Sequence, residues 1–73
     1  MDYRDHLQID PAIRFGKPCI RGTRITVYDV LDWMAAGMSP AAIIDDFPEL
    51  KEVQIRACLA YAADRERQID LAA

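Results

Sequence analysis

Proline and glycine interrupt this chain at short intervals, and their spacing limits which elements it can form. The interruptions are Pro11, Gly16, Pro18 and Gly22 in the first 25 residues, then Gly37, Pro40 and Pro48. Proline removes a backbone donor and glycine favours turns, so we expect no regular helix before Thr26. The 73 residues are predicted to form one small domain, with a strand and loop element over 1–25 and a tri-helical core over 26–73.

Two short strands are predicted within residues 1–25. Apolar and polar residues alternate over residues 7–9 (Leu-Gln-Ile) and 13–15 (Ile-Arg-Phe), and Asp10-Pro11 between them is typical of a turn. A two-stranded ribbon alone is marginally stable in water. We therefore expect it to pack on the helices, to pair with a second subunit, or both.

The apolar spacing after Thr26 predicts three amphipathic helices, at about 27–36, at about 40–47 and from about residue 51 or 52 onward. Thr26 and Ser39 are suitable N-caps for the first two. The third begins without a good cap, because Lys51 cannot accept a hydrogen bond. The residues expected to face the core are Val27, Val30, Leu31 and Met34, then Ile43, Ile44 and Phe47, then Ile55, Cys58, Leu59 and Ala62.

Three helices with short connections are typical of a helix-turn-helix core. The predicted fold class is therefore mainly α, a three-helix helix-turn-helix core preceded by a short N-terminal β-strand element. The turns at Gly37 and at Pro48 could each form the corner of the motif. Trp33 is bulky for the first of them, which favours the second.

The residues that enzymes use are too few and too scattered here to form a reactive centre. The chain has one histidine, His6, and one serine, Ser39, which is expected to cap a helix. Cys19 and Cys58 lack the spacing of a zinc site. One disulfide between them is possible in principle, but a reducing compartment favours two free thiols, with Cys58 in the core. We expect no enzyme activity, no metal and no cofactor.

Charge is unevenly placed along the chain. Residues 1–24 contain five basic and three acidic residues, whereas residues 25–73 contain four basic and nine acidic ones. The basic residues between 14 and 24, which no acid interrupts, are Arg14, Lys17, Arg21 and Arg24. An anionic partner is therefore expected to meet this segment, while a pI near 4.9 excludes a generally basic nucleic-acid coat.

The start of the chain lacks the apolar stretch of a signal peptide, and the longest apolar run, residues 58–63, is far too short to cross a membrane. A cytoplasmic location without membrane contact is expected. A chain this short buries only a modest core, so self-association into a homodimer is expected to supply further apolar contact.

Four segments of the chain carry a recognisable pattern: residues 16–29 (Gly-Lys-Pro-Cys-Ile-Arg-Gly-Thr-Arg-Ile-Thr-Val-Tyr-Asp), 36–40 (Ala-Gly-Met-Ser-Pro), 46–50 (Asp-Phe-Pro-Glu-Leu) and 55–62 (Ile-Arg-Ala-Cys-Leu-Ala-Tyr-Ala). Together they resemble domain-of-unknown-function family 433. The resemblance implies a homeodomain-like helix-turn-helix grouped with VapB-type antitoxins. It further implies a protein that binds and neutralises a PIN-like ribonuclease toxin and that binds operator DNA as a dimer. The motif positions carried over as candidates are Lys17, Arg21 and Arg24.

Two groups of side chains are candidates for binding. The candidates for nucleic acid or a partner are Arg14, Lys17, Arg21 and Arg24, together with Lys51, Gln54 and Arg56 at the start of the third helix. The candidates for toxin contact are Arg65 and Arg67, which could reach the acidic metal site of a nuclease. The alternative is a protein–protein interaction module that does not bind DNA, in which the acidic helices meet a basic partner.

Overall fold

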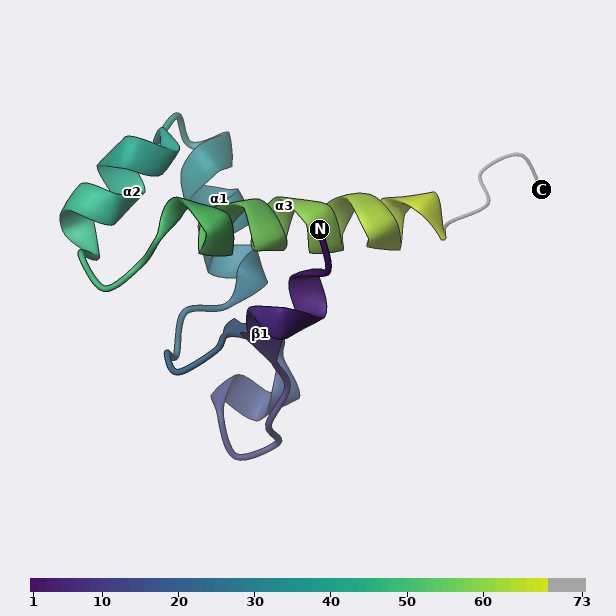
Figure 1. Ribbon diagram of the computed structural model, residues 1–73. Helices are drawn as coiled ribbons and strands as arrows, with labels where there is room; N and C mark the ends of the chain where they lie inside the picture. Colours follow the sequence, from purple (N-terminus) through teal and green to yellow (C-terminus); the bar gives the residue numbers. More distant parts are fainter. Residues whose placement is uncertain (69–73) are drawn as a thin grey trace.

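The computed structural model describes residues 1–68, and the protein is mainly helical with a short two-stranded element near its N-terminus. The helices are α1 (Val27–Ala35), α2 (Pro40–Asp46) and α3 (Glu52–Arg67), and the strands are β1 (Leu7–Gln8) and β2 (Cys19–Ile20). Two single 3₁₀ turns, η1 (Tyr3–Asp5) and η2 (Arg14–Gly16), complete the described part. Figure 1 shows α3 crossing the molecule, with α1 and α2 gathered over its first half and the strands on another side.

The second strand lies at Cys19–Ile20, so the strand predicted at 13–15 is wrong. β1 and β2 are antiparallel, with Leu7 opposite Ile20. Residues 14–16 form η2 instead, and Arg14 and Phe15 adopt the left-handed region with φ of 50° and 61°. Alternation over three residues cannot distinguish a strand from such a turn.

The loop after β2 returns along the strand and leads directly into α1. The backbone N–H of Ile20 donates to the carbonyl of Ile25 over 2.8 Å, and that of Val27 donates to the carbonyl of Pro18 over 2.9 Å. Thr26 is 1% exposed and begins α1, where its hydroxyl and the Asp29 carboxylate form a reciprocal capping box. The basic segment is therefore fixed to the start of α1 by backbone bonds.

The core lies between α3, the other two helices and the strands. Its buried members are Leu7, Ile20, Val27, Val30, Ile43, Leu50, Ile55, Ala57 and Cys58. Leu59 was expected there but is 39% exposed, because α3 turns Ala57 and Cys58 inward. Trp33 of α1 stacks on Phe47 after α2, with ring centroids 4.9 Å apart, and both rings pack against the core.

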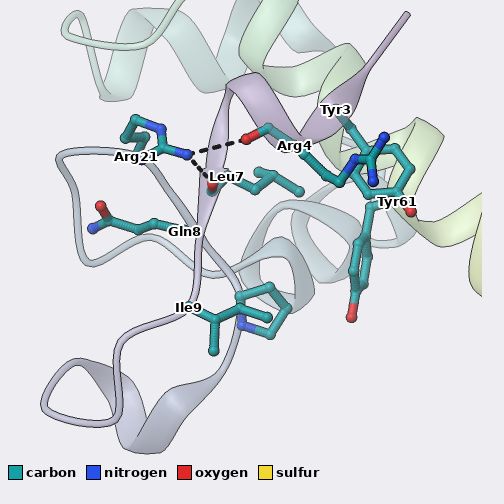
Figure 2. A pocket seen from close by; sticks show the side chains of 8 residues that line it. Tyr3, Arg4, Leu7, Gln8, Ile9, Arg21 and Tyr61 are labelled. Atoms are coloured by element: carbon teal, nitrogen blue, oxygen red, sulfur yellow. Dashed lines mark hydrogen bonds between the residues drawn. The ribbon is translucent and has the colours of Figure 1, made fainter.

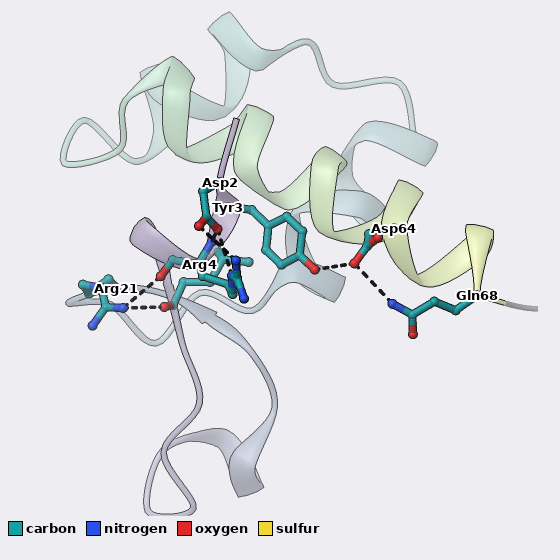
Figure 3. Close-up of polar contacts among 7 residues, drawn as sticks. Asp2, Tyr3, Arg4, Arg21, Asp64 and Gln68 are labelled. Atoms are coloured by element: carbon teal, nitrogen blue, oxygen red, sulfur yellow. Dashed lines mark hydrogen bonds and ion pairs between the residues drawn. The ribbon is translucent and has the colours of Figure 1, made fainter.

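The first residues of the chain are tied to the second half of α3. The Tyr3 hydroxyl donates to Asp64, whose carboxylate also accepts from Gln68, as Figure 3 shows. The Tyr3 ring meets Tyr61 edge-on at 5.5 Å. No helix within residues 1–68 is both long enough and apolar enough to cross a membrane.

Candidate binding surfaces

Arg14 is bound within the fold. Its guanidinium donates to the Asp29 carboxylate over 3.0 Å and to the Arg24 carbonyl over 2.8 Å. Burial would raise the pKa of Asp29, but the Thr26 backbone N–H and the Arg14 guanidinium stabilise the carboxylate and hold that pKa below its usual value. Arg14 therefore joins the loop to α1, although 36% of its side chain stays exposed.

Arg21 is also used within the protein. Its guanidinium donates to the carbonyls of Arg4, Asp5 and Leu7 over 3.1, 3.3 and 2.8 Å, two of which Figure 2 shows. These bonds connect the turn after β2 to η1 and β1. The planar guanidinium suits this task because it offers several donors at fixed angles.

Lys17 and Arg24 are the two cations of the basic segment that stay available. Both side chains are exposed, and neither forms an ion pair or side-chain hydrogen bond within residues 1–68. Of the four basic candidates in this segment, two therefore have structural partners and two present unpaired charge.

The start of α3 holds the next three candidates. The Gln54 side-chain oxygen accepts from the Lys51 backbone N–H over 2.8 Å, which is one half of a capping box, while Lys51 offers no side-chain acceptor to the first turn of α3. Arg56 lies 3.4 Å from Glu52 on the surface. Lys51 is exposed.

One hollow of about 580 Å³ is lined by Arg24, Phe47 and Glu49, among others. The end of the basic segment therefore lies beside the turn that leads into α3.

The second half of α3 carries the toxin-contact candidates. The Arg65 guanidinium carbon lies 5.9 Å from the centre of the Tyr61 ring, and Arg67 lies 3.7 Å from Asp64. The Arg67 side chain is 72% exposed in that ion pair. Figure 1 shows this end of α3 extending past the other helices.

Phe15 is a surface feature that the sequence did not reveal. Its side chain is 96% exposed although the strand pattern suggested a half-buried position. Two hollows share Pro18 and Tyr61, one of about 380 Å³ beside Leu7 and Ile9 (Figure 2) and one of about 260 Å³ beside Tyr28 and Leu31. No spacing rule identifies such a residue, because its exposure depends on the left-handed turn.

Both thiols are buried and free. Burial raises the pKa of Cys58 to about 12, and it raises the pKa of Cys19 as well. Among residues 1–68, no three histidine, cysteine or acidic side chains gather as a metal site would require. The described surface carries exposed cations, the exposed Phe15 ring and two hollows with apolar lining residues.

The protein is a small, mainly helical domain with a two-stranded N-terminal element. The chain matches the family described as "Protein of unknown function (DUF433)" over residues 7–62. It belongs to this family, as its motif from Gly16 to Asp29 indicates.

Three known proteins are similar to this chain. An uncharacterized protein y4eO of Sinorhizobium fredii (strain NBRC 101917 / NGR234) is 39% identical over 59 residues, which is 81% of this chain and 27% of that protein. The crystal structure of a DUF433 member from Anabaena variabilis has a TM-score of 0.82 at 25% identity, over 89% of this chain and 64% of that one. Rv2018 from Mycobacterium tuberculosis has a TM-score of 0.67 at 32% identity, over 80% of this chain and 27% of that one. The chain thus spans about a quarter of the length of y4eO and of Rv2018.

Proposed function

We propose that this protein is the antitoxin of a type II toxin–antitoxin pair, acting in the cytoplasm, where it binds and neutralises a PIN-like ribonuclease toxin. The resemblance of its motif to an antitoxin-grouped family motivates the proposal. The observation that carries it is the exposed end of α3, which extends past the other helices (Figure 1) and bears Arg65 and Arg67 between the acidic residues Asp64 and Glu66.

The proposed inhibition follows from the chemistry of nucleases that use metal ions. Clustered carboxylates hold a divalent cation at such a site, and an inserted guanidinium binds carboxylates through paired hydrogen bonds. Arg67 can leave Asp64 at little cost, because an exposed pair at 3.7 Å contributes little and Asp64 keeps its bonds from Tyr3 and Gln68. A displaced cation would leave the nuclease inactive.

Co-expression of the chain with the nuclease encoded beside it tests this proposal. We expect the untagged nuclease to co-purify and its RNase activity to be lost in the complex. Arg65→Ala combined with Arg67→Ala is expected to restore most of that activity. Arg56→Ala is the comparison variant, since Arg56 is an exposed arginine on the same helix with a similar weak ion pair but belongs to the candidates at the start of α3, so its inhibition separates the two groups. Full inhibition by the double variant would exclude the α3 end as the inhibitory element.

A second proposed role is binding of operator DNA as a homodimer. It is favoured by the unpaired cations Lys17 and Arg24, and by the position of Arg24 beside the turn that leads to Lys51 and α3. Cations that neutralise phosphates supply most of the affinity for DNA and make it fall steeply with salt. Lys17→Ala with Arg24→Ala is therefore expected to weaken binding for all sequences.

A gel-shift assay over a range of salt concentrations, with operator and unrelated duplexes, measures this role. Arg4→Ala is the control, because Arg4 is 80% exposed and lies outside the basic segment. Absence of operator binding by the wild type would favour the alternative, an interaction module without DNA contact.

A further inference from the structure

Phe15 is an aromatic side chain that the fold leaves outside. It is 96% exposed, whereas other exposed large apolar residues, such as Ile9 at 65% and Tyr28 at 66%, keep part of their surface covered. Nearly the whole ring is therefore open to solvent, and its faces are free to receive a flat group. Aromatic rings prefer stacked or edge-on partners, and such contacts contribute more than the buried area alone.

The ring is carried by an ordered turn. Phe15 lies in η2, where its φ is 61°, in the left-handed region that bulky residues rarely adopt. The Arg14 guanidinium is held by Asp29 and by the Arg24 carbonyl, and the Lys17 backbone N–H donates to the Arg14 carbonyl over 3.2 Å. Figure 1 shows the loop between β1 and β2, in blue-violet, extending away from the three helices. A ring presented in this way loses little conformational entropy when it binds.

The charges around this loop are almost all positive. No acidic residue lies between Asp10 and Asp29, and Asp29 is paired with Arg14. Asp10 itself accepts a hydrogen bond from the Ala12 backbone N–H over 2.9 Å. Three exposed cations of the segment form no ion pair with a carboxylate of residues 1–68, and they are Lys17, Arg21 and Arg24.

Two of these cations lie close to the ring. Lys17 follows Phe15 by two residues, and the bond from Arg14 to the Arg24 carbonyl brings the Arg24 backbone beside the same turn. Arg21 keeps its positive charge, but its guanidinium is bonded to neutral carbonyls of η1 and β1. The ring is therefore accompanied by two free cations, so the charge selects a partner that is anionic as well as flat.

Single-stranded nucleic acid offers both of these properties. Proteins bind it with aromatic rings, on which bases stack, and with cations, which bind the phosphates. A duplex offers the same phosphates, but its base faces already cover one another, and a ring can enter only after the bases are unstacked. Two free cations in a chain of net charge −3 supply little attraction to offset that cost. The observations therefore favour a single strand over a duplex.

We propose that the loop between β1 and β2 binds single-stranded nucleic acid, with an unpaired base stacked on Phe15 and neighbouring phosphates bound by Lys17 and Arg24. Every base has a flat face, so this contact selects single strands without selecting a sequence. The site goes beyond the proposed operator role, which depends on the cations and does not need the ring. It is also independent of the proposed nuclease, because its test uses the purified chain alone.

Fluorescence anisotropy with labelled strands of about 12 nucleotides, in DNA and RNA forms, tests the site. We expect binding of a single strand by the wild type and a dissociation constant raised about tenfold for Phe15→Ala. Phe15→Tyr keeps an aromatic face and is expected to bind as the wild type does, whereas Phe15→Leu keeps only apolar bulk and should bind weakly. Ile9→Ala is the control, since Ile9 is an exposed apolar residue outside the basic segment. Circular dichroism establishes that each variant is folded.

Salt dependence separates the ring from the cations. Each phosphate contact on a single strand contributes about 0.7 to the slope of log affinity against log salt, so Lys17→Ala with Arg24→Ala should reduce the slope by about 1.4. Phe15→Ala should lower the affinity and leave the slope unchanged. A strand of abasic nucleotides keeps its phosphates but offers no base, so wild type and Phe15→Ala should bind it equally weakly.

Several results would overturn the proposal. These are a wild type that binds neither DNA nor RNA single strands, and a Phe15→Ala variant that binds them as the wild type does. An effect of Phe15→Ala on duplex binding alone would make the ring a wedge between base pairs instead. Loss of nuclease binding by Phe15→Ala, with single-strand binding unchanged, would assign the ring to a protein partner.

Discussion

The Arg14 guanidinium lies 3.0 Å from the Asp29 carboxylate and joins the turn under Phe15 to the first turn of α1. Asp29 at the same time accepts from the Thr26 backbone N–H at 3.1 Å. One carboxylate therefore caps a helix and orders the segment that carries the free cations and the exposed ring. This arrangement makes Asp29 the residue whose loss affects both the fold and the proposed binding surface.

Asp29→Asn is expected to lower the free energy of unfolding by about 1 kcal/mol at neutral pH, since it removes the charge from a helix cap and from a partly exposed ion pair. Urea unfolding monitored by circular dichroism measures the change. Asp32→Asn on the same helix is the control, because Asp32 is exposed and has no bonded partner within residues 1–68. Equal stability of the Asp29 variant and wild type would contradict the role assigned to this pair.

The pH dependence of this contribution has a definite sign. The pKa of Asp29 in the folded protein lies below its ordinary value of 3.8, so the folded state stabilises the charged form. The stabilisation is complete above the unfolded pKa and is lost as the pH falls through the folded pKa. The stability difference between wild type and Asp29→Asn should therefore shrink as unfolding is measured at decreasing pH below 3.8. A difference that grew on acidification would contradict the assignment.

Arg21→Ala is expected to destabilise the protein by about 1–3 kcal/mol, because three backbone carbonyls lose a charged donor. Arg21→Lys should recover little, since an ammonium cannot reach the Arg4, Asp5 and Leu7 carbonyls with the same planar geometry. Thermal unfolding compares the two variants with Lys17→Ala, which removes an unpaired cation of the same segment. If an Arg21 variant lost DNA binding, the loss would therefore reflect altered folding as well as the removed positive charge.

Phe15→Gly is expected to raise the free energy of unfolding of the monomer by about 0.5–1 kcal/mol, although it removes a large apolar side chain. Relief of the left-handed strain outweighs the added chain entropy, because Phe15 is almost fully exposed and contributes little to the core. Chemical unfolding at low protein concentration measures this effect. Phe15→Ala, which keeps a Cβ in the strained region, should not show the gain.

The sequence predicted the helical part of the fold well, because the periodic spacing after Thr26 and the caps Thr26 and Ser39 are local signals. The strand predicted at 13–15 was wrong because alternation over three residues does not distinguish a strand from a turn, and because Arg14 bonds to Asp29, which is distant in the sequence. The same constraint explains why Phe15 was not identified as exposed. For the cations, the sequence showed the charge of Arg14 and Arg21 but could not show that carbonyls and a carboxylate of the same chain already bind them.

Cys58 provides a chemical measure of global unfolding. It is 0% exposed and burial raises its pKa to about 12, so the reactive thiolate is almost absent from the native protein at pH 8. In a Cys19→Ala background, labelling of Cys58 by a thiol reagent should proceed only through opening of the α3 core. Its rate should then rise in parallel with the unfolded fraction as urea is added. Rapid labelling of the native chain would show that α3 opens locally. Slow labelling would show that α3, the helix that carries Arg65 and Arg67 at its end, stays packed in the native protein.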